Sequence, residues 1–400
     1  MNKVEITENI LYVGVDDREI DLFEGQYAVP EGVSYNSYLI MDEKIALMDT
    51  VDVHKSEEWL ANIKVILGTR QPDYLIVSHM EPDHAGSIAV AVEEFPDMKL
   101  VGNAKTFAFM EQFFGFDIDA KKIVVSDGDM LTLGKHELKF IFAPMVHWPE
   151  VMMSYESCDK ILFSADGFGK FGALDADGFG KFGALDADED WACEARRYYF
   201  NIVGKYGAQV QAVLKKLAGV EINAICPLHG PILKENLGYY INLYDTWSAY
   251  RPESEGILVA YASIYGNTAK AAKKLAELLE MKGAPKVAIT DLARDDMAEA
   301  IEDAFRYNKM VLACSTYDGG IFPCMEDFLS HLKAKNYQKR TVALIENGTW
   351  APMAGKKMRE QLEGMKEVKV MENVVTIRST VKEDTLEALN VLADEIIAEA

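Results

Sequence analysis

The sequence predicts an α/β protein with two parts, an αββα sandwich followed by a doubly wound parallel sheet. Two observations lead to this. In the first half, short strands with polar breaks are interspersed with helical stretches, as in two stacked sheets covered by helices. In the second half, strands and helices alternate regularly, as in a parallel sheet. The 400 residues suggest two domains. The polar, Pro- and Gly-containing break at 251–256 sets the predicted domains at 1–251 and 252–400.

The first half contains the expected elements of the sandwich. Residues 55–67 have helical spacing, because Trp59, Ile63 and Ile66 fall on one face. Further helices are expected at 85–95 and 104–114. The expected strands are short apolar runs bounded by polar residues, at 10–15, 37–40, 44–49, 74–77, 99–101, 123–125, 130–133 and 138–142.

A cluster of metal-capable side chains follows the expected strand 74–77. His79, Glu81, Asp83 and His84 lie within six residues of one another. In extended or turn geometry His79 and Glu81 can point one way while Asp83 and His84 point another, so one segment can serve two metal ions. Imidazole and carboxylate without thiolate suit iron, manganese or zinc. The alternative is a solvated, charged turn.

Three more strand ends carry potential ligands. His147 follows the strand 138–142, Asp166 follows the strand 161–163, and His229 follows the strand 222–225. One such residue is more often an ordinary polar group than a ligand, but three beside the first cluster favour a metal site. The other histidines, His54, His136 and His331, lack this context and are expected to be surface or structural.

An 11-residue segment next to these ligands is duplicated. Residues 166–176, Asp-Gly-Phe-Gly-Lys-Phe-Gly-Ala-Leu-Asp-Ala, recur identically at 177–187. Two copies are too few for a solenoid, so a lengthened Gly-rich loop is expected. Asp166 and Asp177 become rival ligands, and Asp166 is favoured because only it directly follows the strand 161–163.

The second half reads as five strand–helix units. The apolar run 257–262 suits a strand buried on both faces of a parallel sheet. Further strands are expected at 287–289, 310–314, 341–345 and 368–377, with helices at 268–281, 296–306, 324–333, 354–365 and 383–398. This is the flavodoxin-like pattern, whose ligand binds at the carboxyl ends of the strands.

The loops at those strand ends indicate a phosphate and a planar ring. The first combines hydroxyls with a glycine before a helix N-terminus, which suits a phosphomonoester. The other two offer aromatic and backbone groups. The predicted cofactor-binding residues are Ser263, Ile264, Tyr265, Gly266, Asn267, Thr268, Ser315, Thr316, Tyr317, Asp318, Gly319, Asn347, Gly348, Thr349 and Trp350. Ordinary βα turns are the alternative.

Composition excludes several classes of protein. The net charge of −23 would repel a phosphate backbone, so no nucleic-acid partner is expected. The five cysteines form no Cys-x-x-Cys pair, which makes a disulfide framework or a Cys-ligated cluster improbable. No apolar run approaches the length of a membrane span, and the N-terminal residues lack a signal-peptide core. A cytoplasmic location without membrane association is expected.

At this point the sequence resembles the flavodiiron proteins over nearly its whole length. The His-x-Glu-x-Asp-His motif at 79–84 is similar to that of a metallo-β-lactamase-like domain of the iron-binding branch. The Ser-x-Tyr-Gly-Asn-Thr motif at 263–268 is similar to that of a flavodoxin-like domain. The resemblance implies a metallo-β-lactamase-like αββα sandwich followed by a flavodoxin-like doubly wound sheet.

The resemblance also implies a ligand set for two non-haem irons. His79, Glu81, His147 and a bridging Asp166 would hold one iron. Asp83, His84, His229 and the same Asp166 would hold the other. In some family members the histidine that corresponds to His84 swings away from the metal. Tyr198 or Tyr199 would supply a nearby catalytic hydroxyl.

The implied activity is reduction of O2 to water, of NO to N2O, or both, with electrons relayed through FMN from a rubredoxin-type donor. A head-to-tail homodimer or dimer of dimers is implied. One alternative is a dinuclear zinc hydrolase with a flavodoxin-like appendage, which Glu81 and the FMN-type loops disfavour. Another is an electron-transfer flavoprotein with a structural metal domain, which the complete ligand set disfavours.

Overall fold

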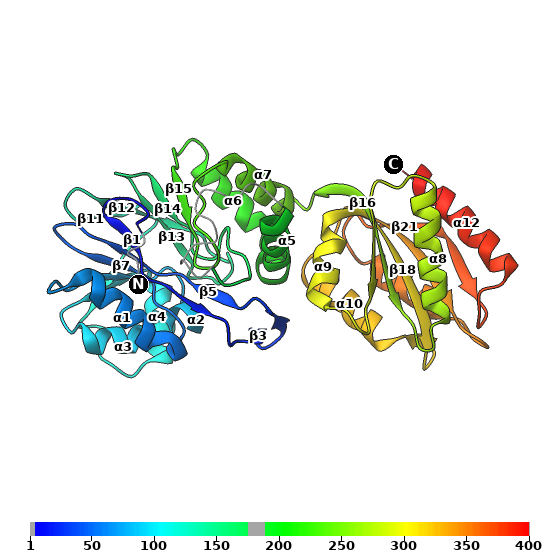
Figure 1. The fold of residues 1–400 in the computed structure, drawn as a ribbon, viewed down its shortest axis with the longest axis horizontal. Helices are drawn as coiled ribbons and strands as arrows, with labels where there is room; N and C mark the ends of the chain where they lie inside the picture. The colour runs from blue at the N-terminus through cyan, green and yellow to red at the C-terminus, as the bar shows by residue number, and fades with distance from the viewer. Residues whose placement is uncertain (1–4, 175–188, 400) are drawn as a thin grey trace. The chain divides into compact units, whose positions relative to one another are not determined.

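The computed structural model of the protein describes residues 5–174 and 189–399, and it divides into two compact units (Figure 1). The first comprises Met1–Tyr199 and Ala208–Asp245, and the second comprises Phe200–Gly207 and Thr246–Ala400. The chain therefore contributes a short segment, Phe200–Gly207, to the second unit before it completes the first. The domain boundary expected between residues 251 and 252 stays a prediction.

The described part of the first unit contains two large sheets. The first sheet has the order β1-β6-β7-β8-β9-β10, and the second has the order β11-β12-β13-β14-β15. The first sheet consists of β1 (Ile10–Tyr12), β6 (Tyr38–Ile40), β7 (Ala46–Met48), β8 (Tyr74–Ile76), β9 (Lys99–Gly102) and β10 (Lys122–Val124). The second consists of β11 (Met130–Thr132), β12 (Glu137–Phe142), β13 (Met152–Glu156), β14 (Ile161–Phe163) and β15 (Ala224–Cys226).

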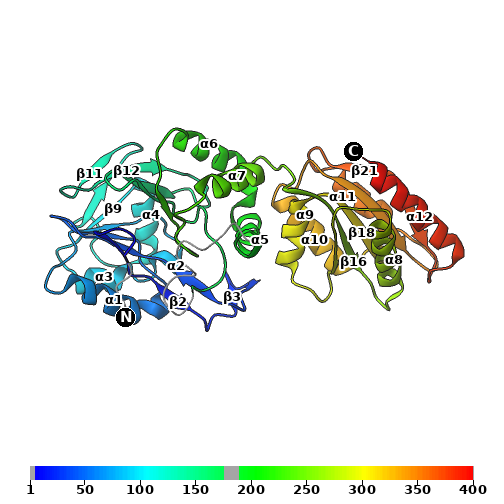
Figure 2. The ribbon, with the colours of Figure 1, turned by 45° about the horizontal axis from the view of Figure 1, so that its top comes forward.

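Apolar side chains from both sheets form one core. Ile76 and Val101 from the first sheet belong to the same buried cluster as Phe140 and Phe163 from the second. Helices α1 (Ser56–Leu67) and α3 (Ile88–Glu94) lie on one side of the unit, and α6 (Gly207–Leu217) and α7 (Leu237–Ser248) lie on the other (Figures 1 and 2). This is the predicted αββα arrangement.

Several elements of this unit differ from the prediction. Strand β13 was not predicted, although Met153-Ser154-Tyr155-Glu156 alternates between apolar and polar residues as a strand does. The expected helix 85–95 is two helices, α2 (Pro82–Ala85) and α3. Pro82 occupies the first turn of α2, where its missing N–H costs nothing. The remaining elements are α4 (Ala104–Phe113), α5 (Glu189–Tyr198) and two strand pairs, β2 (Val15–Asp17) with β5 (Val33–Tyr35) and β3 (Leu22–Phe23) with β4 (Tyr27–Ala28).

The second unit is a doubly wound sheet with the order β17-β16-β18-β20-β21, and all neighbouring pairs on this path are parallel. Its strands are β16 (Ser254–Ala262), β17 (Val287–Asp291), β18 (Tyr307–Tyr317), β20 (Thr341–Asn347) and β21 (Lys369–Ile377), and the short β19 (Gly320–Ile321) pairs with the end of β18. The strand order reverses between β16 and β18. Ligands of such sheets bind at this switch point, outside the carboxyl ends of the strands.

Helices cover both faces of this sheet. Helices α8 (Asn267–Met281) and α12 (Glu383–Ala398) pack together on one face, and α9 (Met297–Arg306) and α10 (Pro323–Ala334) pack together on the other (Figure 1). Helix α11 (Ala354–Leu362) contacts α10. Within 5–174 and 189–399, the structure contains no helix long and apolar enough to cross a membrane.

Candidate functional site

In three strands of the first unit, a candidate ligand lies the same number of residues after the end of the strand. His79 lies three residues after the end of β8, Asp166 three after the end of β14, and His229 three after the end of β15. Strands β14 and β15 are parallel, and Phe163 is paired with Cys226. The register therefore brings Asp166 and His229 to the same edge of the sheet. His147 arrives on the loop that follows β12.

The first group of ligands consists of His79, Glu81, His147 and Asp166. Nε2 of His79 lies 3.2 Å from Oε2 of Glu81 and 3.2 Å from Oδ2 of Asp166. Nε2 of His147 lies 2.9 Å from Oε2 of Glu81 and 3.2 Å from Oδ2 of Asp166. Two bonds of ~2.1 Å from a single metal ion leave neighbouring ligand atoms roughly 3 Å apart, so this spacing fits one ion.

The second group consists of Asp83, His84 and His229. Nε2 of His84 and Nε2 of His229 are 2.9 Å apart, and each lies 3.2 Å from Oδ2 of Asp83. Oδ1 of Asp166 faces this group, 3.4 Å from His84 Nε2 and 3.8 Å from His229 Nε2. Asp166 therefore directs one oxygen toward each group.

The residues present fit two metal ions. Every member of the two groups except the half-buried Glu81 is buried, and Asp166 is fully inaccessible to solvent. Neither carboxylate oxygen of Asp83 or of Asp166 has a hydrogen-bond partner among the described residues. Buried carboxylates are costly unless paired or bound to metal. Because these oxygens face nitrogen atoms without hydrogen-bond geometry, they fit shared ligation of an ion better than mutual hydrogen bonding.

The pKa values of the carboxylates and imidazoles in the two groups are shifted by their mutual contacts. Burial opposes ionisation of Asp166, but the neighbouring His79 and His147 outweigh it and hold the pKa of that carboxyl well below its usual range. Burial likewise lowers the pKa of His84, but Asp83 and Asp166 raise it to about 10. The carboxylates therefore stay ionised beside the imidazoles, and bound divalent metal ions would take the place of the imidazole protons.

Two glutamates beside the ligands were missed by the sequence analysis. Glu150 is fully buried and lies 2.7 Å from Nδ1 of His79. Glu24, between β3 and β4, retains exposed surface but interacts with Glu81, and partial desolvation together with the charge of Glu81 raises the pKa of Glu24 to about 7. Neither residue follows a strand of the ligand-bearing type, so no local pattern identifies them.

The predicted tyrosines lie in different surroundings. The ring of Tyr198 is buried, with its centroid 5.5 Å from that of His229. The ring of Tyr199 instead contacts Tyr244, at a centroid distance of 5.1 Å. The ring of Tyr198 therefore lies against a candidate ligand, and a catalytic role for either tyrosine stays a prediction. The rival ligand Asp177 lies outside the described residues.

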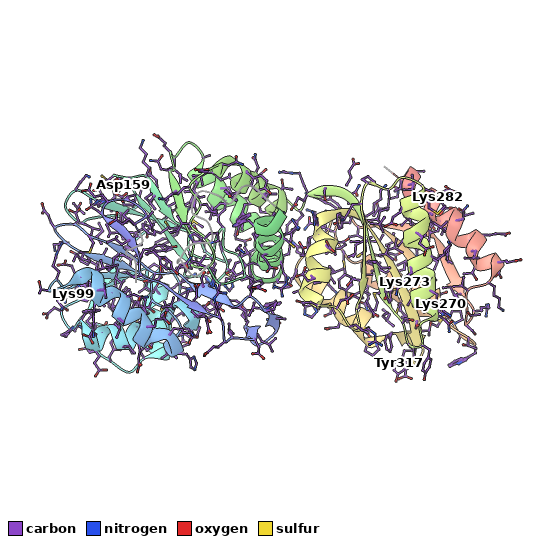
Figure 3. All side chains as sticks on the ribbon, viewed as in Figure 1. Lys99, Asp159, Lys270, Lys273, Lys282 and Tyr317 are labelled. Carbon is purple, nitrogen blue, oxygen red and sulfur yellow. The ribbon has the colours of Figure 1, made fainter. Side chains whose placement is uncertain are left out.

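The second unit contains a cavity at its predicted cofactor site. It lies at the carboxyl ends of β16, β18 and β20, and Tyr317, labelled in Figure 3, lies at the end of β18. The lining includes all the predicted cofactor residues except Gly266 and Tyr317, and it adds Ala351 and Ser379. Ser379 was missed because it follows the last strand, β21, where no phosphate-type pattern occurs.

Hydrogen bonds shape this cavity. The Thr268 and Ser315 hydroxyls lie 2.8 Å apart, and Asn347 Nδ2 donates to Thr268 Oγ1 at 3.2 Å. Gly266 precedes α8 with a φ of +86°, a conformation that glycine adopts without strain. The N-terminus of α8 favours an anion, and the side chains of Tyr265 and Trp350 are 93% and 84% exposed and available to a planar ring. The cavity therefore fits an aromatic cofactor with a phosphate.

Comparison with known proteins assigns both units. Residues 33–230 match the family model of ODP family beta lactamases, and residues 258–376 match that of a flavodoxin domain. The chain is 30% identical to an uncharacterised protein of Methanocaldococcus jannaschii, covering 96% of this chain and 95% of that one. It is 29% identical to a nitric oxide reductase of Moorella thermoacetica, covering 99% and 98%.

Two solved structures are similar over the whole chain. Rubredoxin oxygen:oxidoreductase from Desulfovibrio gigas superposes with a TM-score of 0.90 at 26% identity, covering 98% of this chain and 97% of that one. The flavodiiron protein from Giardia intestinalis superposes with a TM-score of 0.91 at 27% identity, covering 100% and 97%. The predicted fold class, a metallo-β-lactamase-like domain followed by a flavodoxin domain, is confirmed.

Proposed function

The chain belongs to the flavodiiron proteins, a family of oxidoreductases, and from this premise we propose that it reduces O2 to water, NO to N2O, or both, at a non-haem di-iron centre. The flavodoxin domain implies FMN. Electrons would pass through this FMN from a rubredoxin-type donor. The proposed iron ligands are His79, Glu81, Asp83, His84, His147, Asp166 and His229.

The observation that carries the proposal is the position of Asp166. Its Oδ2 lies 3.2 Å from Nε2 of both His79 and His147, whereas its Oδ1 faces His84 and His229. One carboxylate thus connects two ligand groups that are otherwise separate. A bridging carboxylate between imidazole and carboxylate ligands suits a pair of redox-active ions that bind one small substrate together.

The chain's own residues hold and enclose this centre. Aromatic rings pack edge-on against the proposed ligands: Phe23 against His229, with centroids 5.3 Å apart, and Trp148 against His79, also at 5.3 Å. They fix the imidazole planes and limit the access of water. When bound, two irons and FMN together supply the electrons that reduction of a diatomic gas requires.

The cofactor residues of the second unit have matching roles. The Ser263 hydroxyl accepts from the backbone N–H groups of Gly266 and Ala269, at 3.1 and 3.2 Å, and so holds the loop around the start of α8. The loop is positioned to receive the FMN phosphate through backbone N–H groups. We further propose the head-to-tail homodimer or dimer of dimers that the family resemblance implies. The cytoplasmic location stays a prediction.

Metal and flavin content of anaerobically purified protein tests the proposal. About two irons and one FMN per chain are expected, with consumption of O2 or NO when reduced rubredoxin is supplied. His79→Ala or Asp83→Ala should abolish gas consumption while FMN stays bound, because the FMN cavity lies in the other unit. Zinc without flavin, together with failure of iron to restore activity, would point to the dinuclear zinc hydrolase instead. Full cofactor content without consumption of either gas would leave only an electron-transfer flavoprotein.

A further inference from the structure

We propose that Glu150 is a positioning residue that orients His79 and makes the metal ion on the His79 side the more easily oxidised of the pair. The inference rests on the proposed di-iron function and deepens it. It is carried by three observations: the hydrogen bonds of Glu150, the equal charge of the two ligand groups, and the different partners of the other ligand imidazoles.

Glu150 is held rigidly beside His79. Its Oε1 accepts from Nδ1 of His79 at 2.7 Å and from the backbone N–H of Met80 at 2.9 Å. Its own backbone carbonyl accepts from Asn103 Nδ2 at 2.5 Å. With Nδ1 engaged, the imidazole must present Nε2 to Glu81 and Asp166, which is where the structure places it. Carboxylate partners of this kind fix the tautomer and raise the basicity of a ligand imidazole.

The two ligand groups are otherwise equal in charge. Each contains two imidazoles and one carboxylate of its own, Glu81 in one and Asp83 in the other, and they share Asp166. The direct ligands alone therefore give no reason for one ion to lose an electron before its neighbour. Any difference has to come from groups that touch the ligands.

The groups behind the imidazoles are unequal. Nδ1 of His79 faces the carboxylate of Glu150, whereas Nδ1 of His229 faces the neutral backbone carbonyl of Ser34 at 2.8 Å. Nδ1 of His84 has no hydrogen-bond partner among the described residues. Negative charge close to one ion favours its higher oxidation state, and the effect is strong in a buried site of low dielectric constant.

Glu150 is also poorly compensated by its own surroundings. Its second oxygen, Oε2, is buried without a hydrogen-bond partner in the described part of the chain. Burial of an ionised carboxylate with so few donors is costly unless positive charge is near. The cationic metal site behind His79 supplies that charge, which accounts for a glutamate in this position.

The chain contains a matched pair for comparison. His136 and Glu156 form a second buried His–Glu contact, with Nδ1 of His136 3.0 Å from Oε1 of Glu156. Here the carboxylate also accepts the backbone N–H groups of Cys158 and Asp159, at 2.7 and 2.8 Å. Glu156 is thus satisfied as the cap of a turn, and His136 belongs to neither of the two ligand groups that Asp166 connects. Replacing Glu156 removes the same buried charge without touching those groups.

The test compares Glu150→Gln, Glu150→Ala and Glu156→Gln by iron content and by an EPR-monitored redox titration. Glu150→Ala should lower iron affinity about 10- to 100-fold, as loss of such a partner typically does. Glu150→Gln keeps an acceptor for His79 Nδ1 and should restore iron binding. Its first oxidation, from the all-ferrous to the mixed-valent state, should move to higher potential, whereas Glu156→Gln should leave that potential unchanged.

The outcomes separate this inference from the proposed function. Wild-type protein without two irons would overturn the di-iron function itself. Wild-type protein with two irons, combined with a Glu150→Gln potential equal to that of wild type, would overturn only the role of Glu150. An equal shift in Glu150→Gln and Glu156→Gln would also overturn it, because the effect would then reflect loss of any buried charge.

Discussion

The two identical copies of the segment at 166–187 allow a sharp test of the bridging ligand. Deleting residues 166–176 or residues 177–187 yields the same sequence, so deletion cannot show which aspartate serves the metals. Point substitution can. We predict that Asp166→Asn abolishes binding of both metals, whereas Asp177→Asn, the same chemical change in the second copy, has no effect.

The structure ties the first copy firmly into the first unit. Leu228 N–H donates to Ala165 O at 2.9 Å, directly before Asp166. At the other end of the copy, Ala173 N–H donates to Glu31 O at 2.9 Å and Leu174 N–H donates to Asp16 Oδ1 at 2.9 Å. Because the copies are identical, the second copy could form equivalent contacts, but using it as the bridge would require the chain to bulge by 11 residues directly after a buried strand end. Buried backbone left without partners makes that register unfavourable.

The expected magnitude follows from the contacts of Asp166. Residues that only support a ligand typically contribute about 10- to 100-fold to metal affinity. Asp166 faces both groups directly, so its loss should lower the binding affinity for each ion by at least about 100-fold, or about 2.7 kcal/mol. Asparagine has the same shape, which limits collapse of the site, but it lacks the charge and the second carboxylate oxygen.

The assay is iron per chain after anaerobic titration with ferrous ion, with FMN per chain as the internal control for folding. Asp166→Asn should retain FMN and lose iron, and Asp177→Asn should retain both. If Asp166→Asn kept two irons, or if Asp177→Asn lost them, the assignment of the bridge to the first copy would be refuted. Partial iron loss in both variants would show that the chain exchanges its two registers.

Three further predictions concern the duplication, the FMN cavity and a buried arginine. Deletion of residues 177–187 should leave iron and FMN content unchanged, because the first copy alone supplies the contacts described above; loss of iron would contradict this. Thr268→Val should weaken FMN binding, measured by flavin fluorescence, about 5- to 10-fold, because it removes a buried hydroxyl that is hydrogen-bonded to two cavity residues. Thr290→Val lies outside the cavity and should leave FMN affinity unchanged. Arg340→Met should destabilise the second unit by about 3 kcal/mol or more in urea unfolding, because the buried guanidinium donates to several backbone carbonyls. Arg294→Met, at a side chain that is 81% exposed, should change the urea unfolding midpoint little.

The grouping of the proposed ligands could be predicted from the sequence because each occupies a position with a local signal. His79, Asp166 and His229 all follow short apolar strands, and parallel strands bring such positions to one edge. The loops that line the cavity of the second unit could be predicted for the same reason. Ser379 could not be predicted as a lining residue of the cavity, because the strand end that carries it has no glycine and no helix N-terminus directly behind it.

Residues that act through tertiary contact could not be predicted in this way. Glu150 is 71 positions from His79, and it lies late in the loop between β12 and β13, not directly after a strand end. The segment Phe200–Gly207 also gives no local indication that it belongs to the second unit. There, the ring of Phe200 stacks on Phe305 with centroids 4.2 Å apart, and Asn201 Nδ2 donates to Ala298 O at 3.1 Å.

The difference between the proposed ligands and the residues that contact them also bears on the choice between O2 and NO. The chain is similar over nearly its whole length both to a relative named for oxygen and to one named for nitric oxide, so overall similarity does not separate the two substrates. The proposed ligands form two groups of equal charge, and two ions held by them would bind any small diatomic between them. What differs between the two sides lies one contact further out, at Glu150 behind His79 and at Tyr198 beside His229. We therefore expect Glu150→Gln, which retains iron, and Tyr198→Phe to change the ratio of the two activities, and substitutions of the proposed ligands to abolish both activities together.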